Sequence, residues 1–151
     1  MPIRFLLSLL ACALAAQSPA LAASPEQWEA VSRTAMAITG NVRFSPDRIT
    51  FQNGKFLALA PAGAITVTEG RESRPATLYR VTKPDDPVLL QGTRLCGGRT
   101  PEPVTFIAVW RHQPFGGDVD PRDLIVYSGS ASPANGGGHS CATYSYEAGH
   151  R

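Results

Sequence analysis

Beyond residue 32 the chain is built from short apolar runs separated by glycine, proline, asparagine and aspartate. Several of these runs alternate apolar and polar residues. Ile49 and Phe51 are separated by a threonine, and so are Ile65 and Val67. Because successive side chains of a strand point to opposite faces, this period of two predicts strands with one buried face.

The Asn53-Gly54 pair predicts a tight hairpin between two of these strands, because both residues tolerate positive φ. The runs and breaks together predict about eight to ten short strands, which is typical of a small antiparallel β-barrel or sandwich. The predicted strands span residues 34–39, 42–44, 48–51, 56–60, 65–68, 76–81, 87–95, 104–111, 123–128 and 142–147.

Residues 104–110 are apolar on both faces, which favours a central strand covered on both sides or a strand that lines a small closed barrel. Near the start, the segment Ser24-Pro25-Glu26-Gln27 combines a helix cap, a proline suited to the first helical position and a capping-box glutamine. It predicts a short helix over residues 25–32, anchored by Trp28. The predicted fold class is therefore mainly β: a small antiparallel β-barrel or sandwich with a short N-terminal helix and one disulfide.

The first residues of the chain have the composition of an export signal. Arg4 precedes an apolar run from Phe5 to Ala16, and the small-residue pattern Ala20-Leu21-Ala22 follows. The run is roughly half of the ~20 residues that a membrane-spanning helix needs. We expect a signal peptide over residues 1–22, a single β-rich domain over residues 23–151, and no transmembrane segment in the mature chain.

A lipoprotein signal is the alternative interpretation of the same segment. The stretch Leu9-Leu10-Ala11-Cys12 resembles the lipobox of bacterial lipoproteins, in which Cys12 would carry the lipid. The apolar run before Cys12 is very short, and the small-residue cleavage pattern lies downstream of it. A periplasmic or secreted location is therefore favoured over an anchor at Cys12.

Export would place Cys96 and Cys141 in an oxidising compartment, where an isolated pair in a small domain most often forms a disulfide. Closing a loop of about 45 residues stabilises a fold by about 4 kcal/mol in the chain-entropy model. The alternative is a zinc or copper site with His139, joined by His112 or His150, which requires reduced thiols. The disulfide is the prediction, and no metal ion or other cofactor is expected.

The charges of the chain are scattered. It carries 14 basic and 12 acidic residues, for a formal net charge of +2. No nucleic-acid partner is expected, because such proteins concentrate their positive charge. The sequence has no Gly-x-Ser-x-Gly motif, and His112 is the one histidine beside a predicted strand, so no nucleophilic triad and no catalytic residue is predicted.

Two groups of aromatic and basic residues are candidates for binding. Trp110, Arg111 and His112 would form a cationic patch with an aromatic edge, suited to an acidic ligand, although an arginine over an indole is also common surface structure. Tyr144 and Tyr146 would project from one face of a strand. Core packing with the hydroxyls at the rim is favoured for them over a recognition surface.

Three aspartates, Asp118, Asp120 and Asp123, follow a glycine pair at close spacing and could offer the oxygen ligands that calcium requires. The match to an EF-hand loop fails, because Arg122 and Asp123 stand where that loop has an acid and a glycine. A solvated turn, in which the aspartates accept hydrogen bonds from nearby backbone amides, is the favoured interpretation.

Four segments carry a resemblance to other proteins: Thr34-Ala35-Met36-Ala37-Ile38-Thr39-Gly40, Asp47 to Gly54, Leu95-Cys96-Gly97 and Cys141-Ala142-Thr143-Tyr144. In these the chain resembles a group of small exported bacterial proteins that carry no assigned activity. The resemblance implies export and a compact domain, and it transfers no catalytic or binding residue. In general architecture the chain is similar to envelope inhibitors of lysozyme and proteases and to lipocalin-like binders, by analogy only.

The leading functional hypothesis is a non-catalytic binding or interaction module of the bacterial envelope. It would engage a protein or a small ligand through its loops and the region from Trp110 to Asp123. The alternatives are a structural or envelope-maintenance protein and, less favoured, a metal-dependent enzyme that uses the aspartate loop.

Overall fold

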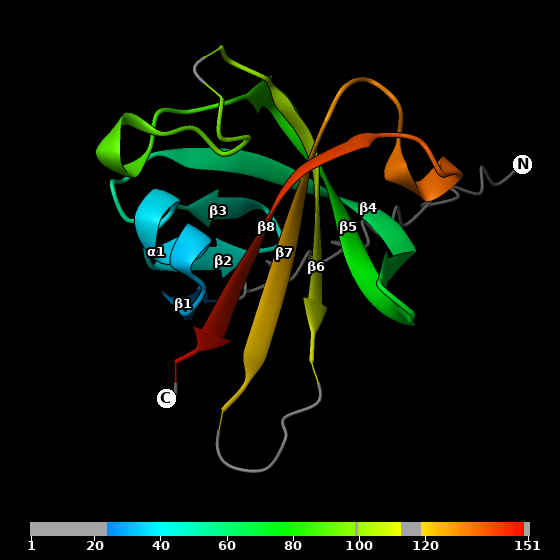
Figure 1. The fold of residues 1–151 in the computed structure, drawn as a ribbon, viewed down its shortest axis with the longest axis horizontal. Coiled ribbons are helices and arrows are strands. Elements are labelled where there is room, and N and C mark those ends of the chain that lie inside the picture. Colours follow the sequence, from blue (N-terminus) through cyan, green and yellow to red (C-terminus); the bar gives the residue numbers. More distant parts are fainter. Residues whose placement is uncertain (1–23, 99, 113–118, 150–151) are drawn as a thin grey trace, which may run out of the picture.

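Eight antiparallel strands close into a barrel within the residues that the computed structural model describes, which are 24–98, 100–112 and 119–149 (Figure 1). Each strand pairs with its neighbours in the chain, and the last pairs with the first. The predicted fold class is confirmed in its barrel form. The strands are β1 (Glu26–Ala30), β2 (Val42–Ser45), β3 (Arg48–Thr50), β4 (Phe56–Glu69), β5 (Glu72–Asp85), β6 (Val104–Arg111), β7 (Pro121–Ser128) and β8 (His139–Ala148).

The barrel interior holds the larger hydrophobic cluster, which we call the inner cluster. It gathers every second residue of the strands, as the period-two pattern predicts. Its largest side chains with almost no exposed surface include Trp28, Ile49, Ile107, Leu124, Tyr144 and Tyr146.

A second hydrophobic cluster, the outer cluster, covers the outer face of β5, β6 and β7. It consists of Val67, Ala76, Leu78, Ala108, Trp110 and Ile125. Because β6 has Ile107 in the inner cluster and Ala108 in the outer one, both faces of this strand are covered, as its apolar sequence predicts.

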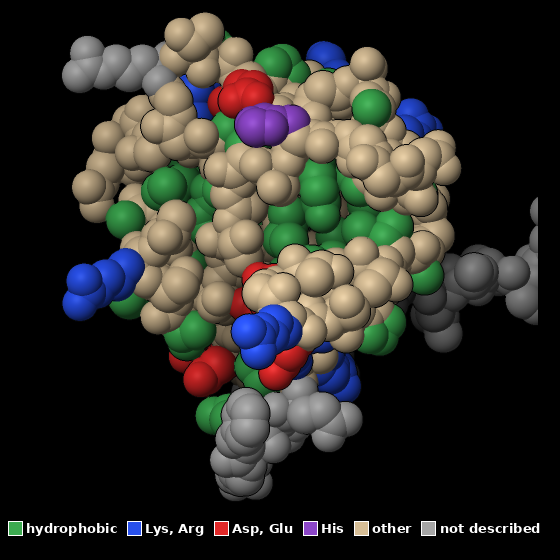
Figure 2. All heavy atoms as spheres, turned by 45° about the vertical axis from the view of Figure 1, so that its right-hand side comes forward, with side chains coloured by type: hydrophobic (Ala, Val, Ile, Leu, Met, Phe, Trp, Pro, Cys, Tyr) green, Lys and Arg blue, Asp and Glu red, His purple; other side chains and the backbone are tan. Residues whose placement is uncertain are grey.

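The outer cluster exists because β4 and β5 extend beyond the barrel as an arm, residues 64–76. The register of the two strands shifts between Pro61 and Ala64, and Gly63 has a φ of 101° in this bulge. Val67 and Ala76 of the arm then pack against the outer face of the barrel. On the side of the molecule where the arm lies, hydrophobic side chains line the floor of a hollow (Figure 2).

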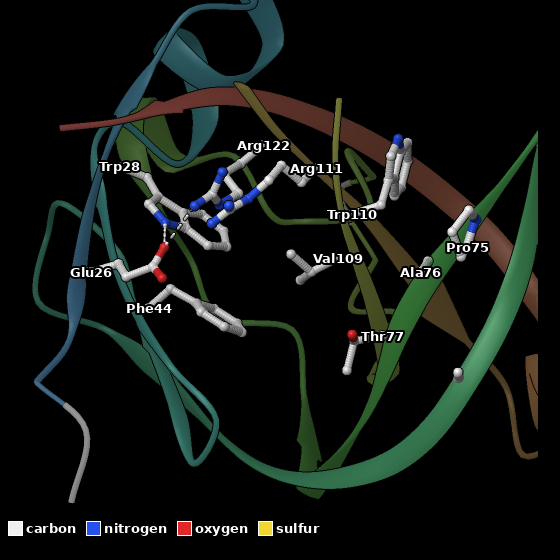
Figure 3. A pocket seen from close by; sticks show the side chains of 11 residues that line it. Glu26, Trp28, Phe44, Pro75, Ala76, Thr77, Val109, Trp110, Arg111 and Arg122 are labelled. Atoms are coloured by element: carbon white, nitrogen blue, oxygen red, sulfur yellow. Dashed lines mark hydrogen bonds and ion pairs between the residues drawn. The ribbon is translucent and has the colours of Figure 1, made fainter. Parts of the chain in front are cut away.

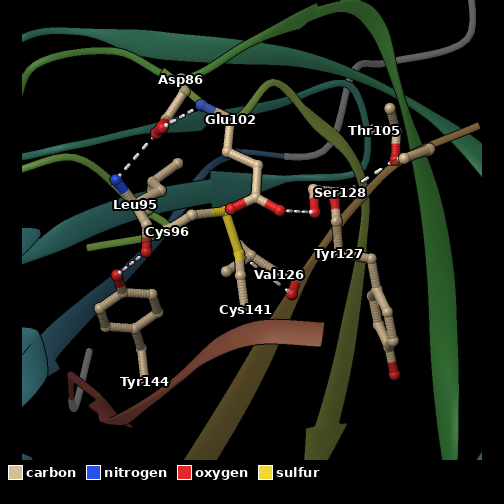
Figure 4. Close-up of a disulfide and its surroundings, with 11 residues drawn as sticks. Asp86, Leu95, Cys96, Glu102, Thr105, Val126, Tyr127, Ser128, Cys141 and Tyr144 are labelled. Atoms are coloured by element: carbon tan, nitrogen blue, oxygen red, sulfur yellow. Dashed lines mark hydrogen bonds between the residues drawn. A yellow bond between two sulfur atoms is a disulfide. The ribbon is translucent and has the colours of Figure 1, made fainter. Parts of the chain in front are cut away.

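One end of the barrel is plugged by the β5–β6 connection, which contains the short helix η1 (Leu90–Gly92), and by the helix α1 (Arg33–Ile38). Leu89, Leu95 and Ala35 from these segments belong to the inner cluster. The carboxylate of Asp86, itself buried, accepts hydrogen bonds from the backbone N–H groups of Leu95 at 2.9 Å and Glu102 at 3.0 Å (Figure 4). These bonds hold the connection in place.

The predicted disulfide is present and joins the plug to β8. Cys96 lies in the β5–β6 connection and Cys141 in β8, with their Cα atoms 5.0 Å apart (Figure 4). The second short helix, η2 (Pro133–Asn135), lies in the β7–β8 connection. The Asn53-Gly54 turn joins β3 and β4, so the predicted hairpin is confirmed.

The helix prediction for residues 25–32 is wrong. Glu26–Ala30 is β1, and the helix follows at Arg33–Ile38, where a strand was expected over residues 34–39. The Ser32 side chain caps this helix by accepting a hydrogen bond from the Ala35 N–H at 3.1 Å. Pairing of β1 with both β2 and β8 outweighs the local capping pattern.

The strand predicted over residues 87–95 is also wrong. The segment holds η1 and a single bridge between Val88 and Arg94. Gln91 adopts a positive φ of 54°, which a strand does not permit. The apolar residues here are buried as part of the plug, so their hydrophobicity reflects burial and not sheet pairing.

The predicted signal peptide over residues 1–22 and the alternative anchor at Cys12 lie outside the described residues. Among the residues that are described, no helix has the length and hydrophobicity that crossing a membrane would require.

Candidate ligand site at the mouth of the barrel

Opposite the plug, the barrel has a mouth where β1 begins and β6 ends. A cavity of about 330 Å³ lies here. Trp28, Phe44 and Glu26 bound it on one side and Pro75 and Ala76 of the arm on the other, while Thr77 and Val109 lie between the two sides (Figure 3).

The apolar wall of the cavity is a stack of aromatic rings. Trp28 of β1 and Phe44 of β2 lie nearly parallel, with ring centroids 4.5 Å apart, and Phe44 meets Tyr79 of β5 edge to face at 5.3 Å. Such arrangements stabilise an interior beyond the area that they bury. The packed rings therefore make this side of the cavity rigid, and within the stack Phe44 is 7% exposed and Trp28 1%.

The polar side of the cavity is built around two arginines that face each other across β6 and β7. Arg111 is the cross-strand partner of Arg122, and like charges at such positions repel. Asp120 lies between them: its carboxylate accepts two hydrogen bonds from the Arg122 guanidinium, one of them at 2.9 Å, and lies 3.3 Å from Nε of Arg111. The single carboxylate thus neutralises the repulsion.

Glu26 connects this ion cluster to the aromatic wall. Its Oε2 accepts a hydrogen bond from the Trp28 indole N–H at 2.8 Å and another from Nη2 of Arg122 at 3.3 Å. We refer to Glu26, Arg111, Asp120 and Arg122 as the mouth cluster. Its two cations and two anions balance, so its formal charge is zero.

The two arginines differ in accessibility. The Arg122 side chain is only 5% exposed and is occupied by two carboxylates, whereas the Arg111 side chain is 63% exposed. Within the described residues, the terminal nitrogens of Arg111 have no hydrogen-bond partner, because its ion pair uses Nε. Arg111 can therefore donate to a ligand without breaking a contact to another described residue.

The mouth cluster separates two hollows. The first is the cavity between Trp28 and the arm, which we call the inner cavity, and the second is a pocket of about 270 Å³ that reaches Pro25 and Gly149. Glu26, Arg111 and Arg122 line both of them. The inner cavity also borders the arm, because β5 pairs with β6 only from Thr77 onward and its earlier residues pair with β4 alone. A molecule in the inner cavity would contact barrel, arm and mouth cluster together.

The structure divides the predicted binding residues between two places. Arg111 and Asp120 belong to the mouth cluster, and Trp110 reaches the cavity from the outer cluster. His112 and Asp123 lie at the outer face near the arm. Asp118 lies outside the described residues.

His112 has both ring nitrogens engaged. Nε2 contacts the Asp123 carboxylate, and Nδ1 lies 2.8 Å from Nη1 of Arg74, which also pairs with Glu72. A guanidinium can only donate, so Nδ1 accepts and Nε2 carries the proton that faces Asp123. This chain of contacts ties the arm to β6 and β7.

Tyr144 and Tyr146 lie in the inner cluster, as the core-packing interpretation predicts. The Tyr144 hydroxyl donates to the Leu95 carbonyl, and the Tyr146 hydroxyl shares a hydrogen bond with the Thr39 hydroxyl at 2.8 Å. Burial raises the pKa of both phenols well above the ordinary value of 10.0. They support the plug and β8 rather than lining the mouth cavity.

Four residues that line the cavity are not predicted from the sequence as binding residues: Glu26, Trp28, Phe44 and Arg122. The sequence predicts Trp28 as the anchor of a helix, and it places Arg122 where a calcium loop would have an acid. One feature of the sequence could have indicated this site: Arg111 and Arg122 stand at the facing ends of two apolar strands. A cation at the end of an otherwise apolar face requires a counter-charge nearby.

The alternative metal sites are not formed by the described residues. Cys96 and Cys141 are bonded to each other, and no group of three or more potential ligands gathers within the described ranges. Asp120 and Asp123 direct their carboxylates at Arg122 and His112. Comparison of the chain with other proteins found no matching family, no matching curated protein and no matching solved structure.

Proposed function

We propose that this chain is a non-catalytic binding module that takes a small molecule with an apolar body and one anionic group into the mouth of its barrel. The observation that carries the proposal is the cavity between the Trp28–Phe44 stack and Arg111. Eight-stranded barrels are wide enough to hold one small ligand, and cavities near 300 Å³ fall at the lower end of ligand sites.

The apolar part of the ligand follows from the walls of the cavity. Val109 and Pro75 belong to the apolar lining together with Phe44 and Trp28, which are 7% and 1% exposed. Removing apolar ligand surface from water supplies the driving force. The hydroxyl of Thr77, an exposed residue in the same lining, offers one neutral hydrogen-bonding group.

The anionic part of the ligand follows from the different numbers of carboxylates that the two arginines already contact. Arg122 is bonded to both Asp120 and Glu26, whereas the terminal nitrogens of Arg111 have no hydrogen-bond partner among the described residues. A guanidinium forms two parallel hydrogen bonds with a carboxylate, and such charge-assisted bonds are the stronger ones. A carboxylic acid with an aromatic or aliphatic body is the ligand class that fits.

A binding role is also supported by the histidine of this region. His112 would be the obvious base for catalysis, yet Asp123 and Arg74 occupy both of its nitrogens. It lies on the outer face, whereas the mouth cluster faces the interior. The arrangement of His112 serves the attachment of the arm.

The test compares binding of 2-naphthoate with that of its uncharged analogue, 2-naphthamide, by isothermal titration calorimetry. The wild-type domain should prefer the acid. In Arg111→Gln, binding of the acid should weaken about tenfold, which corresponds to one lost charge-assisted bond, and binding of the amide should not change. Val109→Trp should fill the cavity and abolish binding of both.

The matched controls are Arg71→Gln on the exposed end of the arm and Thr82→Trp on the outer face of β5. Neither should change binding of either probe. Equal affinity of the wild type for acid and amide would refute the role of Arg111. Retained binding in Val109→Trp, with an intact fold by near-UV circular dichroism, would refute the cavity as the site.

A further inference from the structure

The outer wall formed by β2, β3, β4 and the second half of β5 concentrates positive charge. Its cations come from β2, β3, the turn between β3 and β4, and β5, and all are exposed. We call this set the basic wall: Arg43, Arg48, Lys55, Arg80 and Lys83.

Strand register places these residues on one surface. Thr50 is the cross-strand partner of both Arg43 and Phe56, so these three side chains share the outer face. In the neighbouring rows, Arg48 pairs with Ala58 and Arg80 with Ala60. Because the two alanine side chains are small, the surface between the arginines is not covered by larger side chains. The strands β2 to β5 form a continuous part of the barrel (Figure 1).

No residue of the basic wall takes part in an ion pair with another described residue, whereas Arg74, Arg111 and Arg122 elsewhere in the barrel do. Two carboxylates border the wall, Asp47 and Asp85. The pKa of Asp47 is lowered by a hydrogen bond that it accepts from Ser45 and also by the charge of Arg48, and Asp85 accepts a hydrogen bond from the backbone N–H of Asp86. Five cations against two carboxylates leave a local excess of positive charge in a chain whose formal net charge is +2.

An exposed aromatic ring lies within this charge. Phe56 is 49% exposed, and the Arg48 guanidinium lies 4.4 Å from the centre of its ring. Beside it is a hollow of about 490 Å³, lined by Phe56, Lys55 and Lys83 together with Ala58 and Pro87. An apolar ring bordered by two lysines offers contacts for both parts of an amphipathic partner.

We propose that the basic wall docks the barrel onto an anionic lipid bilayer, with Lys55 and Lys83 contacting headgroup phosphates and Phe56 entering the interfacial region. Aromatic side chains favour the boundary between headgroups and acyl chains, and each lysine or arginine near an anionic surface adds to the attraction. An acidic protein partner or a polysaccharide would use the cations but would not require the exposed ring. The combination of both features favours a lipid surface.

The test is co-sedimentation of the domain with vesicles of equimolar phosphatidylglycerol and phosphatidylcholine and with vesicles of phosphatidylcholine alone. The domain should sediment with the anionic vesicles and not with the neutral ones, and added salt should release it. Lys55→Glu/Lys83→Glu should weaken binding to anionic vesicles at least about tenfold, and Phe56→Ser should weaken it severalfold at constant charge.

The matched control is Arg33→Glu/Arg71→Glu, which changes the net charge equally but lies on α1 and on the arm. It should bind almost as well as the wild type. If it loses binding to the same extent as the lysine pair, general charge and not the basic wall is responsible. Should the charge reversal impair folding, Lys55→Gln/Lys83→Gln removes the cations without adding repulsion.

Three further results would overturn the proposal: equal sedimentation with neutral vesicles, unchanged binding in Phe56→Ser, or release by millimolar glycerol 3-phosphate. The second would indicate a polyanion other than a membrane, and the third a site for a free phosphate compound. Since the basic wall and the mouth cluster share no residue, binding of 2-naphthoate should be unchanged in these variants. Failure of one proposal is therefore distinguishable from failure of the other.

Discussion

At the scale of single residues, several buried polar side chains of the barrel are held by defined partners. Arg122 is buried with Asp120 and Glu26, and Tyr146 with Thr39. An unpartnered buried charge or hydroxyl would cost several times what its hydrogen bond contributes. These pairings make a small number of residues decisive for the stability of the mouth and the plug.

The buried tyrosines predict alkaline unfolding. The pKa of Tyr144 and Tyr146 is raised in the folded state, whereas in the unfolded chain it is the ordinary 10.0. Above about pH 10 the unfolded state releases phenolic protons that the folded state retains, so the free energy of unfolding should fall as pH rises and be independent of these groups below that pH. Urea titrations between neutral pH and pH 12, with tyrosinate absorbance as a second signal, would measure this.

Tyr146→Phe provides the comparison for this prediction. The variant should be less stable at neutral pH, because it loses the hydrogen bond to Thr39, and its stability should decline less steeply at alkaline pH. A decline as steep as that of the wild type would mean that Tyr146 does not contribute to alkaline unfolding.

At the scale of elements, the plug is the segment whose position depends least on sheet pairing. The β5–β6 connection is held by the disulfide, by the Asp86 carboxylate and by the Tyr144 hydroxyl, which reaches the Leu95 carbonyl. All three anchors are close together in Figure 4. They replace the ladder of backbone hydrogen bonds that a strand at residues 87–95 would have provided.

Removal of the disulfide should therefore destabilise the plug. Cys96→Ala/Cys141→Ala should lower the free energy of unfolding by about 2–4 kcal/mol, because the crosslink restricts the unfolded chain. Asp86→Asn should cost about 1–3 kcal/mol, because an amide can accept through only one of the two atoms that now accept. Urea unfolding of the two variants and of their combination would measure both effects.

The combined variant tests whether the anchors act on one segment. The loss of unfolding free energy in the combined variant should be smaller than the sum of the two separate losses. Once one anchor is removed and the connection is loose, the other anchor contributes less to holding it. Simple additivity would show that the disulfide and Asp86 stabilise the fold independently.

At the scale of the whole molecule, the barrel sheet separates two hydrophobic clusters that share strands β5, β6 and β7. Trp28 belongs to the inner cluster and Trp110 to the outer one, and both are almost fully buried. Since adjacent residues of β6, Ile107 and Ala108, point into different clusters, neither cluster can form while β6 remains unpaired. The molecule should unfold as one cooperative unit.

Single-tryptophan variants test this cooperativity. Trp28→Phe leaves a probe in the outer cluster, and Trp110→Phe leaves one in the inner cluster. In each variant the fluorescence change on thermal unfolding should coincide with the loss of far-UV circular dichroism. An earlier fluorescence change in Trp28→Phe alone would show that the arm and the outer cluster detach before the barrel opens.

The amino-acid sequence by itself determined most strands, the Asn53-Gly54 hairpin, the disulfide and the presence of a doubly covered strand at residues 104–111. These features depend on alternation, turn chemistry and cysteine count, which are local properties. It could not place Glu26 beside Arg122, because that contact arises only when the closing of the barrel pairs β1 with β8, the strand next to β7.

The errors have the same origin. Ser24-Pro25-Glu26-Gln27 resembles a helix start, and residues 87–95 resemble a strand, because short apolar stretches carry little information about their partners. The tertiary structure alone decided that Glu26–Ala30 closes the barrel, that the 87–95 segment plugs it, and that Arg111 lies at the mouth with Asp120 as its ion-pair partner. Sequence encodes which side chains must be buried, whereas only the closed sheet determines which distant residues then meet.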